Sequence, residues 1–266
     1  MKKIVALSCA CSLGFPWAVM AQGPELLSPT RPGVSESAAL LRPGVLQVET
    51  GIDLGFRASD YRRQRSLPLG LNYALTRHLR IDFEADATVE QHLHGGGRAT
   101  GRGDTRLGFK AIGAGEPEQG LAFALAYQLK LPTADADEGL GSGRTDHELR
   151  LVANRVLGKN DFRVNVSYLN VGRAMSPARD DGGQFLVGME RGLAGDFSAT
   201  FEVYRNSVDA AQPRGTYALA ALAVKLRPWL QFDIGLSAGR GRDAPDTGVF
   251  AGLSVGVPMA RAAHSP

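Results

Sequence analysis

Long stretches of strict alternation between apolar and polar residues constrain this chain more than any other feature. In the clearest one, 79–90, every odd position is apolar and every even position is polar or charged. A period of two over such a length is typical of a β-strand with two unlike faces, whereas a helix would mix both kinds of residue on every side. The pattern returns in 162–168, 197–203 and 230–237. The sequence therefore predicts an all-β fold.

Alternating runs of this kind follow one another along the chain, and most are about 10–13 residues long. A tilted transmembrane strand needs about 9–11 residues, whereas strands of soluble proteins cluster near five or six. The length of the runs therefore predicts strands that cross a membrane. The runs lie at 45–57, 65–75, 79–91, 103–114, 119–131, 144–157, 161–172, 183–192, 196–208, 215–226, 229–240 and 247–258.

The connections between these runs alternate in length. Those after the second, fourth, sixth, eighth and tenth runs are short, and the others are generally longer. Short turns on one side and longer loops on the other are typical of bacterial outer-membrane barrels. We therefore predict a transmembrane antiparallel up-and-down β-barrel of about 12 strands, with both termini on the periplasmic side. A secreted β-sandwich or a soluble barrel is the alternative.

One face of the runs is too charged for the core of a soluble barrel. The run from 79 alone would bury five charged side chains, Glu90 among them, and unpaired buried charges are costly. In a membrane barrel the apolar face meets lipid and the charged face lines the lumen. There the charges form either a structural network or a constriction that sets selectivity. The predicted lumen-lining residues are Glu49, Asp53, Arg80, Asp82, Glu84, Asp86, Arg106, Lys110, Arg150, Arg163, Glu202, Lys225 and Asp233.

The chain divides into four predicted parts. Residues 1–21 have the cationic start, apolar stretch and small residue before the cut of a cleavable signal peptide, which directs the chain to the cell outer membrane. Residues 22–44 form a Pro- and Ser-rich periplasmic leader, with folding into the lumen as a plug as a further hypothesis. The barrel occupies 45–258, and 259–266 form a C-terminal tail.

Export changes the composition in two ways. Both cysteines, Cys9 and Cys11, lie in the predicted signal, so the mature chain has neither a disulfide framework nor a cysteine metal site. Removing Lys2 and Lys3 changes the balance of 30 basic and 27 acidic residues to 28 and 27, a net charge of +1. The composition thus predicts no nucleic-acid partner.

Catalytic patterns occur but lack their structural setting. Ser237 and Ser254 each stand in a Gly-x-Ser-x-Gly pattern, which works only on a tight turn between a strand and a helix. Both lie inside alternating runs. His92 and His94 share a face beside a glycine-rich stretch that predicts a loop tip rather than a metal site. We therefore predict no catalytic residue, no metal and no cofactor.

Three stretches resemble one known family. Arg31–Ser37 and Pro43–Gly51 resemble the leader and first strand of the meta-pathway phenol-degradation family of outer-membrane β-barrel proteins. Gly103–Lys110 resembles its GD-x-x-x-G-x-K strand. Leu129–Asp135, with the Gly-Ser-Gly and Asp146 that follow, resembles its LPTGD…GSG…D loop, although alanine replaces the glycine of LPTGD. The resemblance implies a barrel for uptake of hydrophobic or aromatic compounds, without catalytic residues.

The predicted function is a passive outer-membrane channel or transporter for small compounds, including hydrophobic or aromatic ones, without a nucleotide. Its expected partners are outer-membrane lipid, the small-molecule permeant and the barrel-assembly machinery. An outer-membrane lipid-modifying hydrolase is one alternative. A non-transporting structural or surface-antigen barrel is the other, because a charge network in the lumen serves a plugged barrel as well as a channel.

Overall fold

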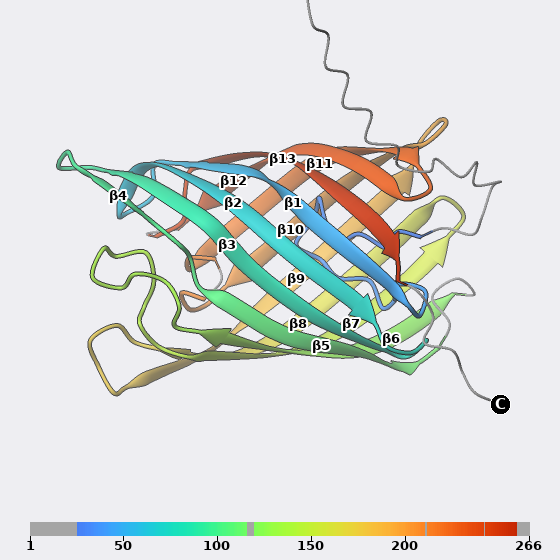
Figure 1. Cartoon of the computed structure of the whole chain (residues 1–266), viewed down its shortest axis with the longest axis horizontal. Coiled ribbons are helices and arrows are strands. Elements are labelled where there is room, and N and C mark those ends of the chain that lie inside the picture. Colours follow the sequence, from blue (N-terminus) through green and yellow to red (C-terminus); the bar gives the residue numbers. More distant parts are fainter. Residues whose placement is uncertain (1–25, 116–119, 211, 242, 260–266) are drawn as a thin grey trace, which may run out of the picture.

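The structure, a computed structural model, describes residues 26–115, 120–210, 212–241 and 243–259, which form a closed antiparallel β-barrel of twelve long strands (Figure 1). The predicted signal and nearly all of the predicted tail lie outside these residues. Each long strand pairs with the next, and the first pairs with the last to close the barrel. The strands are β1 Val45–Phe56, β2 Tyr61–Ala74, β3 Leu79–Leu93, β4 Arg98–Gly101, β5 Thr105–Ala114, β6 Leu121–Leu131, β7 Asp146–Leu157, β8 Asn160–Gly172, β9 Arg179–Gly192, β10 Phe197–Asn206, β11 Gly215–Arg227, β12 Leu230–Arg240 and β13 Thr247–Pro258.

The predicted fold class is confirmed, and each predicted run coincides with a long strand. The differences lie at the end of the barrel that carries the longer loops, on the left in Figure 1. There β2 begins at Tyr61, β9 begins at Arg179, and the short β4 extends the β3 hairpin where a loop was expected. These extensions lie beyond the apolar part of the wall, where neither face must be apolar, so alternation cannot reveal them. We call this the loop end, and the opposite end the turn end.

The two faces of the wall have the polarity of a membrane barrel. Apolar side chains point outward, and Leu151, Val203 and Leu236 are 60%, 57% and 56% exposed. Polar and charged side chains point inward, and Lys110 and Asp233 are 2% and 0% exposed. A soluble barrel would have the reverse arrangement. No helix among the described residues is long and apolar enough to cross a membrane.

A bulge in β3 corrects one prediction. Pro68 of β2 lies opposite Asp86, but its neighbour Leu67 lies opposite Thr88, so Ala87 is an extra residue in the ladder. An extra residue reverses the face on which all later side chains point. Glu90, which strict alternation places in the lumen, therefore shares the outward face of its register partner Arg65.

Candidate functional site

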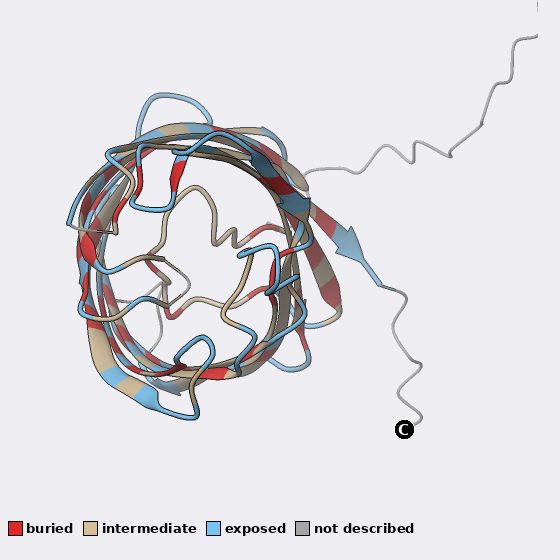
Figure 2. Cartoon of the chain, turned by 90° about the vertical axis from the view of Figure 1, so that its left-hand side faces the viewer, coloured by how far each residue is buried: buried red, intermediate tan, exposed pale blue. Residues whose placement is uncertain are grey.

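The barrel lumen contains residues 26–44, which we call the lumenal segment; Figure 2 shows it crossing the interior of the ring of strands. It enters at the turn end, where the N–H of Leu26 donates to the carbonyl of Pro228 at 3.2 Å. It leaves at the same end, where the N–H of Gly44 donates to the carbonyl of Ala74 at 3.1 Å. The structure thus places this part of the predicted periplasmic leader inside the barrel.

Glu49 of β1 holds the first part of the segment through backbone groups. Its carboxylate accepts the N–H of Thr30 at 2.9 Å, the Thr30 hydroxyl at 2.7 Å and the N–H of Arg31 at 3.2 Å. Beside it, Gln47 accepts the N–H of Ser28 at 2.9 Å. Hydrogen bonds to an ionised acceptor are stronger than neutral ones, so Glu49 fixes the path of the backbone here.

Glu202 of β10 repeats this arrangement further along the segment. It accepts the N–H of Val34 at 2.7 Å, the N–H of Ser35 at 3.0 Å and the Ser35 hydroxyl at 2.5 Å. A side chain on Gly33 would collide with this carboxylate, because its Cβ would lie 2.2 Å from Oε1. A larger residue at this position would have to displace the Glu202 carboxylate, so the segment is fitted to its acceptor.

Between these two contacts, Arg31 bridges the segment to opposite sides of the closing seam. Its guanidinium donates to Asp233 of β12 at 3.1 and 3.3 Å and lies 3.7 Å from Asp53 of β1. Asp233 is fully buried, and the burial of a carboxylate is costly unless a cation compensates it. The lumenal segment supplies this cation, and the pair links it to β12.

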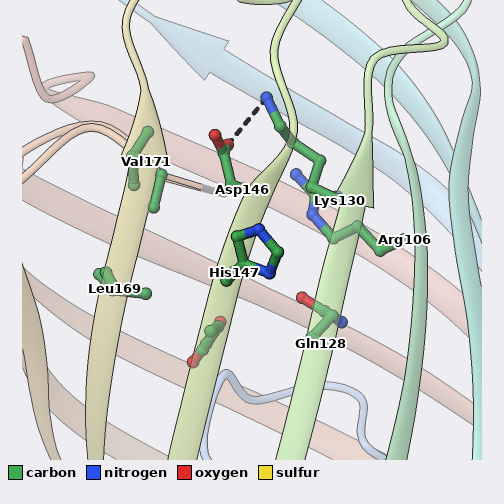
Figure 3. Close-up of a pocket in the computed structure, with 9 residues that line it drawn as sticks. Arg106, Gln128, Lys130, Asp146, His147, Leu169 and Val171 are labelled. Atoms are coloured by element: carbon green, nitrogen blue, oxygen red, sulfur yellow. Dashed lines mark ion pairs between the residues drawn. The ribbon is translucent and has the colours of Figure 1, made fainter. Parts of the chain in front are cut away.

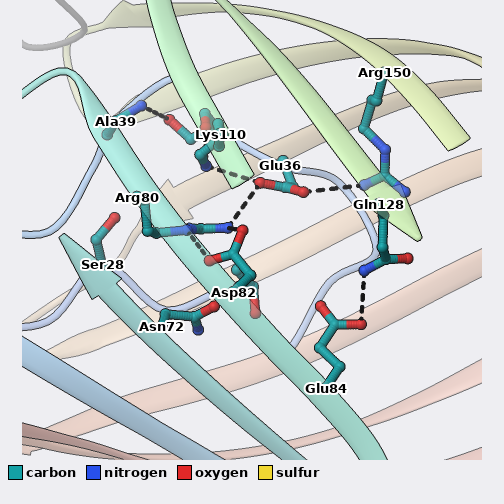
Figure 4. Close-up of polar contacts among 12 residues, drawn as sticks. Ser28, Glu36, Ala39, Asn72, Arg80, Asp82, Glu84, Lys110, Gln128 and Arg150 are labelled. Carbon is teal, nitrogen blue, oxygen red and sulfur yellow. Dashed lines mark hydrogen bonds and ion pairs between the residues drawn. The ribbon is translucent and has the colours of Figure 1, made fainter. Parts of the chain in front are cut away.

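Glu36 is the centre of a basic wall made by β3, β5 and β7 (Figure 4). Its carboxylate lies 2.8 Å from Lys110 Nζ, 3.1 Å from Arg80 Nη2 and 3.5 Å from Arg150 Nη1. Burial by itself would raise the pKa of Glu36, but the three cations outweigh it and hold that pKa well below its usual range. Its removal would leave Lys110 without a carboxylate partner among the described residues, whereas Arg80 keeps Asp82 at 2.5 Å and Arg150 keeps Glu148 at 2.7 Å.

Neutral side chains of the barrel wall also hydrogen-bond the segment. Asn165 of β8 accepts the N–H of Glu36 at 2.7 Å and donates to its carbonyl at 3.0 Å. Asn154 of β7 accepts the N–H of Ala38 at 3.1 Å. The segment thus contacts walls on nearly every side of the lumen, through its backbone as well as its side chains.

Where the segment passes the wall, glycines leave space that side chains would otherwise fill. A Cβ at Gly252 would lie 2.3 Å from Nε of Arg31, and one at Gly256 would lie 2.5 Å from the carbonyl oxygen of Leu26. On the opposite side, a Cβ at Gly188 would approach the Ser35 hydroxyl to 3.0 Å. The barrel therefore has room for the segment as well as partners for it.

Comparison with known proteins places the chain in a family. The model of the family described as "Putative MetA-pathway of phenol degradation" matches residues 30–256. The chain belongs to this family. The match begins inside the lumenal segment, so family membership covers the segment from residue 30 onward as well as the barrel.

Solved structures share the fold of this phenol-degradation family member at low sequence identity. The COG4313 outer membrane channel from Pseudomonas putida F1 is 14% identical, with a TM-score of 0.65 over 87% of this chain and all of the other. The NanC porin is 11% identical, with a TM-score of 0.56 over 79% and 98% of the two chains. The KdgM porin in complex with disordered oligogalacturonate is 8% identical, with a TM-score of 0.54 over the same shares. No curated protein matches the sequence. The fold is that of outer-membrane barrels.

The remaining motif stretches of the family meet near the loop end (Figure 3). Lys130 Nζ lies 2.9 Å from Asp104 and 2.8 Å from Asp146. Each carboxylate also holds a backbone group, since Asp104 accepts the N–H of Ala134 at 3.0 Å and Asp146 accepts that of Gly172 at 2.8 Å. Asp104 and Asp146 thus fasten loops to the barrel rim.

The other predicted lumen-lining residues lie away from the segment or touch it only through a neighbour. Asp82 binds Arg80 at 2.5 Å and Glu84 accepts the Gln128 amide at 3.0 Å. Arg106 lines a small cavity with Gln128 and Lys130. Asp86 packs against Gly103. Arg163 pairs with Asp161 at 2.8 Å and with Glu190 at 2.5 Å. Lys225 is half-buried near the turn end of β11.

Sequence reasoning missed the partners that come from the leader. Arg31, Ser35 and Glu36 carry most of the side-chain contacts from the segment, yet none was predicted as a site residue. They have no strand periodicity, and their only signal is that they stand in the Arg31–Ser37 stretch that resembles the family leader.

Little space remains beside the basic wall. Two lumenal cavities, one lined by Arg106, Lys130 and Asp146 and the other by Glu36, Glu84 and Arg150, each have a volume of about 20 Å³. Such a cavity admits about one water molecule. The segment and its partners therefore narrow this side of the lumen strongly.

Proposed function

We propose that this protein is a passive outer-membrane channel for small molecules, and that the lumenal segment sets its bore. The observation that carries the proposal is the course of the segment, which enters and leaves at the turn end and lies against charged walls on several sides. A polar, partly filled lumen suits the slow passage of small solutes rather than general diffusion. The fold shared with proteins named as channels and porins supports this role.

We further propose that the permeants include hydrophobic or aromatic compounds. The support is the description of the family, which connects it with phenol degradation. We also propose that all thirteen predicted charges point into the lumen, and that Glu84, Asp86 and Arg106, which the segment does not engage, are the ones that meet the permeant. Export through a cleaved signal peptide and insertion by the barrel-assembly machinery complete the proposal.

Conductance and swelling measurements test the channel. Purified full-length protein in planar bilayers is expected to give small, discrete conductance steps. Proteoliposomes should admit arabinose and benzoate faster than protein-free liposomes of the same lipid. Arg106→Gln should shift the reversal potential in a salt gradient, whereas its outward-facing match Arg155→Gln should not, because only a lumenal charge alters ion selectivity.

A non-transporting barrel with a plugged lumen is the second candidate, and the small cavities beside Glu36 favour it. A barrel impermeable to ions and to both solutes, with or without an applied voltage, would exclude the channel and support this candidate. The hydrolase alternative has no such support. Ser237 and Ser254 lie within β12 and β13, and within the described residues neither hydroxyl bonds a histidine.

A further inference from the structure

The outward face of β2, β3 and β4 carries a cluster of arginines at the loop end. The bulge at Ala87 turns Glu90 and His92 outward, where they lie opposite Arg65 and Arg63 of β2. On the other side, His92 lies opposite Arg98 of β4. We call Arg63, Arg65, Arg98, Glu90 and His92 the outer cluster.

Glu90 organises the outer cluster. Its carboxylate lies 3.0 Å from Arg65 Nη2, 3.0 Å from Arg98 Nη2 and 3.0 Å from His92 Nε2. The Glu90 side chain is 10% exposed, whereas those of Arg65 and Arg98 are 52% and 56% exposed. One shielded carboxylate thus orients arginines whose guanidinium groups still face outward. Three arginines against one carboxylate give the cluster a net charge of +2 with His92 neutral.

The outer cluster lies at the upper edge of the apolar wall. On the same face of β2, Arg63 and Arg65 are followed in steps of two residues by Leu67, Leu69, Leu71 and Tyr73. With the usual strand rise and tilt, Arg65 and Arg63 stand about 20–25 Å along the barrel axis from Tyr73. An apolar band of an outer-membrane barrel is about 25 Å tall. The arginines therefore lie where acyl chains end and lipid headgroups begin.

A basic hollow adjoins the cluster at the tips of the neighbouring hairpins. It has a volume of about 710 Å³, and every ionisable residue that lines it is an arginine or a histidine. It shares Arg63 and His92 with the outer cluster. The ionisable lining residues are Arg57, Arg62, Arg63, His92 and His94.

We propose that the outer cluster binds the phosphate of a phosphorylated glycolipid in the outer leaflet, whose acyl chains lie along Leu67, Leu69 and Leu71. A guanidinium group presents a planar fork of N–H donors that matches phosphate oxygens. Each guanidinium has five N–H donors. Within the described residues, Arg65 uses one of them, to Glu90, and Arg98 uses two, to Glu90 and Thr100. A lipid rather than a soluble anion fits because leucines and arginines share one face of β2.

Binding of diphosphorylated lipid A to the purified full-length protein in detergent tests this site. Native mass spectrometry should detect the bound lipid. The triple variant Arg63→Gln/Arg65→Gln/Arg98→Gln should bind it about tenfold or more weakly, because it removes the charge-assisted donors. The matched control is Arg155→Gln/Arg191→Gln, which removes outward arginines at the turn end and should leave binding unchanged. Resistance of the folded band to heating on gels verifies that both variants fold, and the single Arg98→Gln variant serves if the triple variant does not.

Three results would overturn the proposal. The first is equal lipid A binding by the wild type and the folded triple or single variant. The second is displacement of lipid A by an equal concentration of inorganic phosphate, which would indicate a site for the free anion. The third is cluster-dependent binding of a heparin oligosaccharide as tight as that of lipid A, which would indicate a site for soluble polyanions. None of these results depends on whether the lumen conducts.

Discussion

The two halves of the lumenal segment are held by opposite means. From Ser28 to Ser35 the wall is acidic, and Glu49 and Glu202 accept backbone N–H groups of the segment. At Glu36 the wall is basic, and three cations surround a single carboxylate of the segment. A carboxylate can bind any backbone through its N–H groups, but buried cations require a specific anion. The first half therefore depends on the path of the chain, and the second half depends on one side chain.

Deletion of residues 26–42 should have the largest effect, because it removes both halves. We expect the single-channel conductance to rise roughly threefold or more, because removal of the segment enlarges the cross-section of the aqueous pore. Planar-bilayer recordings measure the change. An unchanged conductance in a folded deletion variant would contradict the assignment of the bore to the segment.

Glu36→Gln should come next, because it preserves shape and removes only the anion. The variant leaves Arg80, Lys110 and Arg150 without their shared carboxylate, which should lower the free energy of unfolding by about 3 kcal/mol. Urea unfolding in lipid vesicles measures the loss. Adding Lys110→Gln to this variant should recover part of the stability, and a further loss instead would show that the two residues are not coupled.

Gly252→Val should act on the first half alone. Its Cβ would lie 2.3 Å from Nε of Arg31 and would displace the guanidinium from Asp233. We expect a loss of about 2 kcal/mol in unfolding free energy from overpacking, which the same urea unfolding assay measures. Gly113→Val is a matched control in β5, because its Cβ would meet only the carbonyl oxygen of Phe123, at 3.7 Å.

Glu202→Gln should have a small effect, since the amide oxygen can still accept the N–H and hydroxyl of Ser35, although the amide nitrogen cannot accept the N–H of Val34. The expected loss is about 1 kcal/mol, the contribution of one lost hydrogen bond. The same unfolding assay measures it. A loss as large as that of Glu36→Gln would remove the distinction between the two halves.

Mild acid should have the smallest effect on the basic wall. The pKa of Glu36 is lowered in the folded protein, so its contribution to stability is full above the ordinary glutamate pKa and is lost only as the pH falls through the lowered value. Between pH 7 and about pH 5 the Glu36 contribution should therefore stay constant. Comparison of the wild type with Glu36→Gln at both pH values measures it. A difference in unfolding free energy that shrinks at pH 5 would contradict the assignment.

Much of the barrel was predictable because membrane strands repeat one simple rule. Each strand must show one apolar face to lipid, so residues such as Leu151 and Val203 mark the wall by their spacing alone. Alternation stops being informative beyond the part of the wall that contacts lipid. It did not detect β4, which lies beyond the apolar wall, or the reversal at Ala87, because a bulge leaves the apolar and polar residues in sequence and changes only their register.

The sequence by itself determined the barrel and the polarity of its two faces, because these follow from local alternation and strand length. Only the tertiary structure decided what those charges bind. Glu36 meets Arg80, Lys110 and Arg150 across separations of 44 to 114 residues, and no local pattern encodes which strands of a closed barrel face a segment folded between them. For the same reason, the sequence showed Arg63, Arg65 and Arg98 as three scattered cations. The pairing of β2, β3 and β4 brought them together on one outward surface.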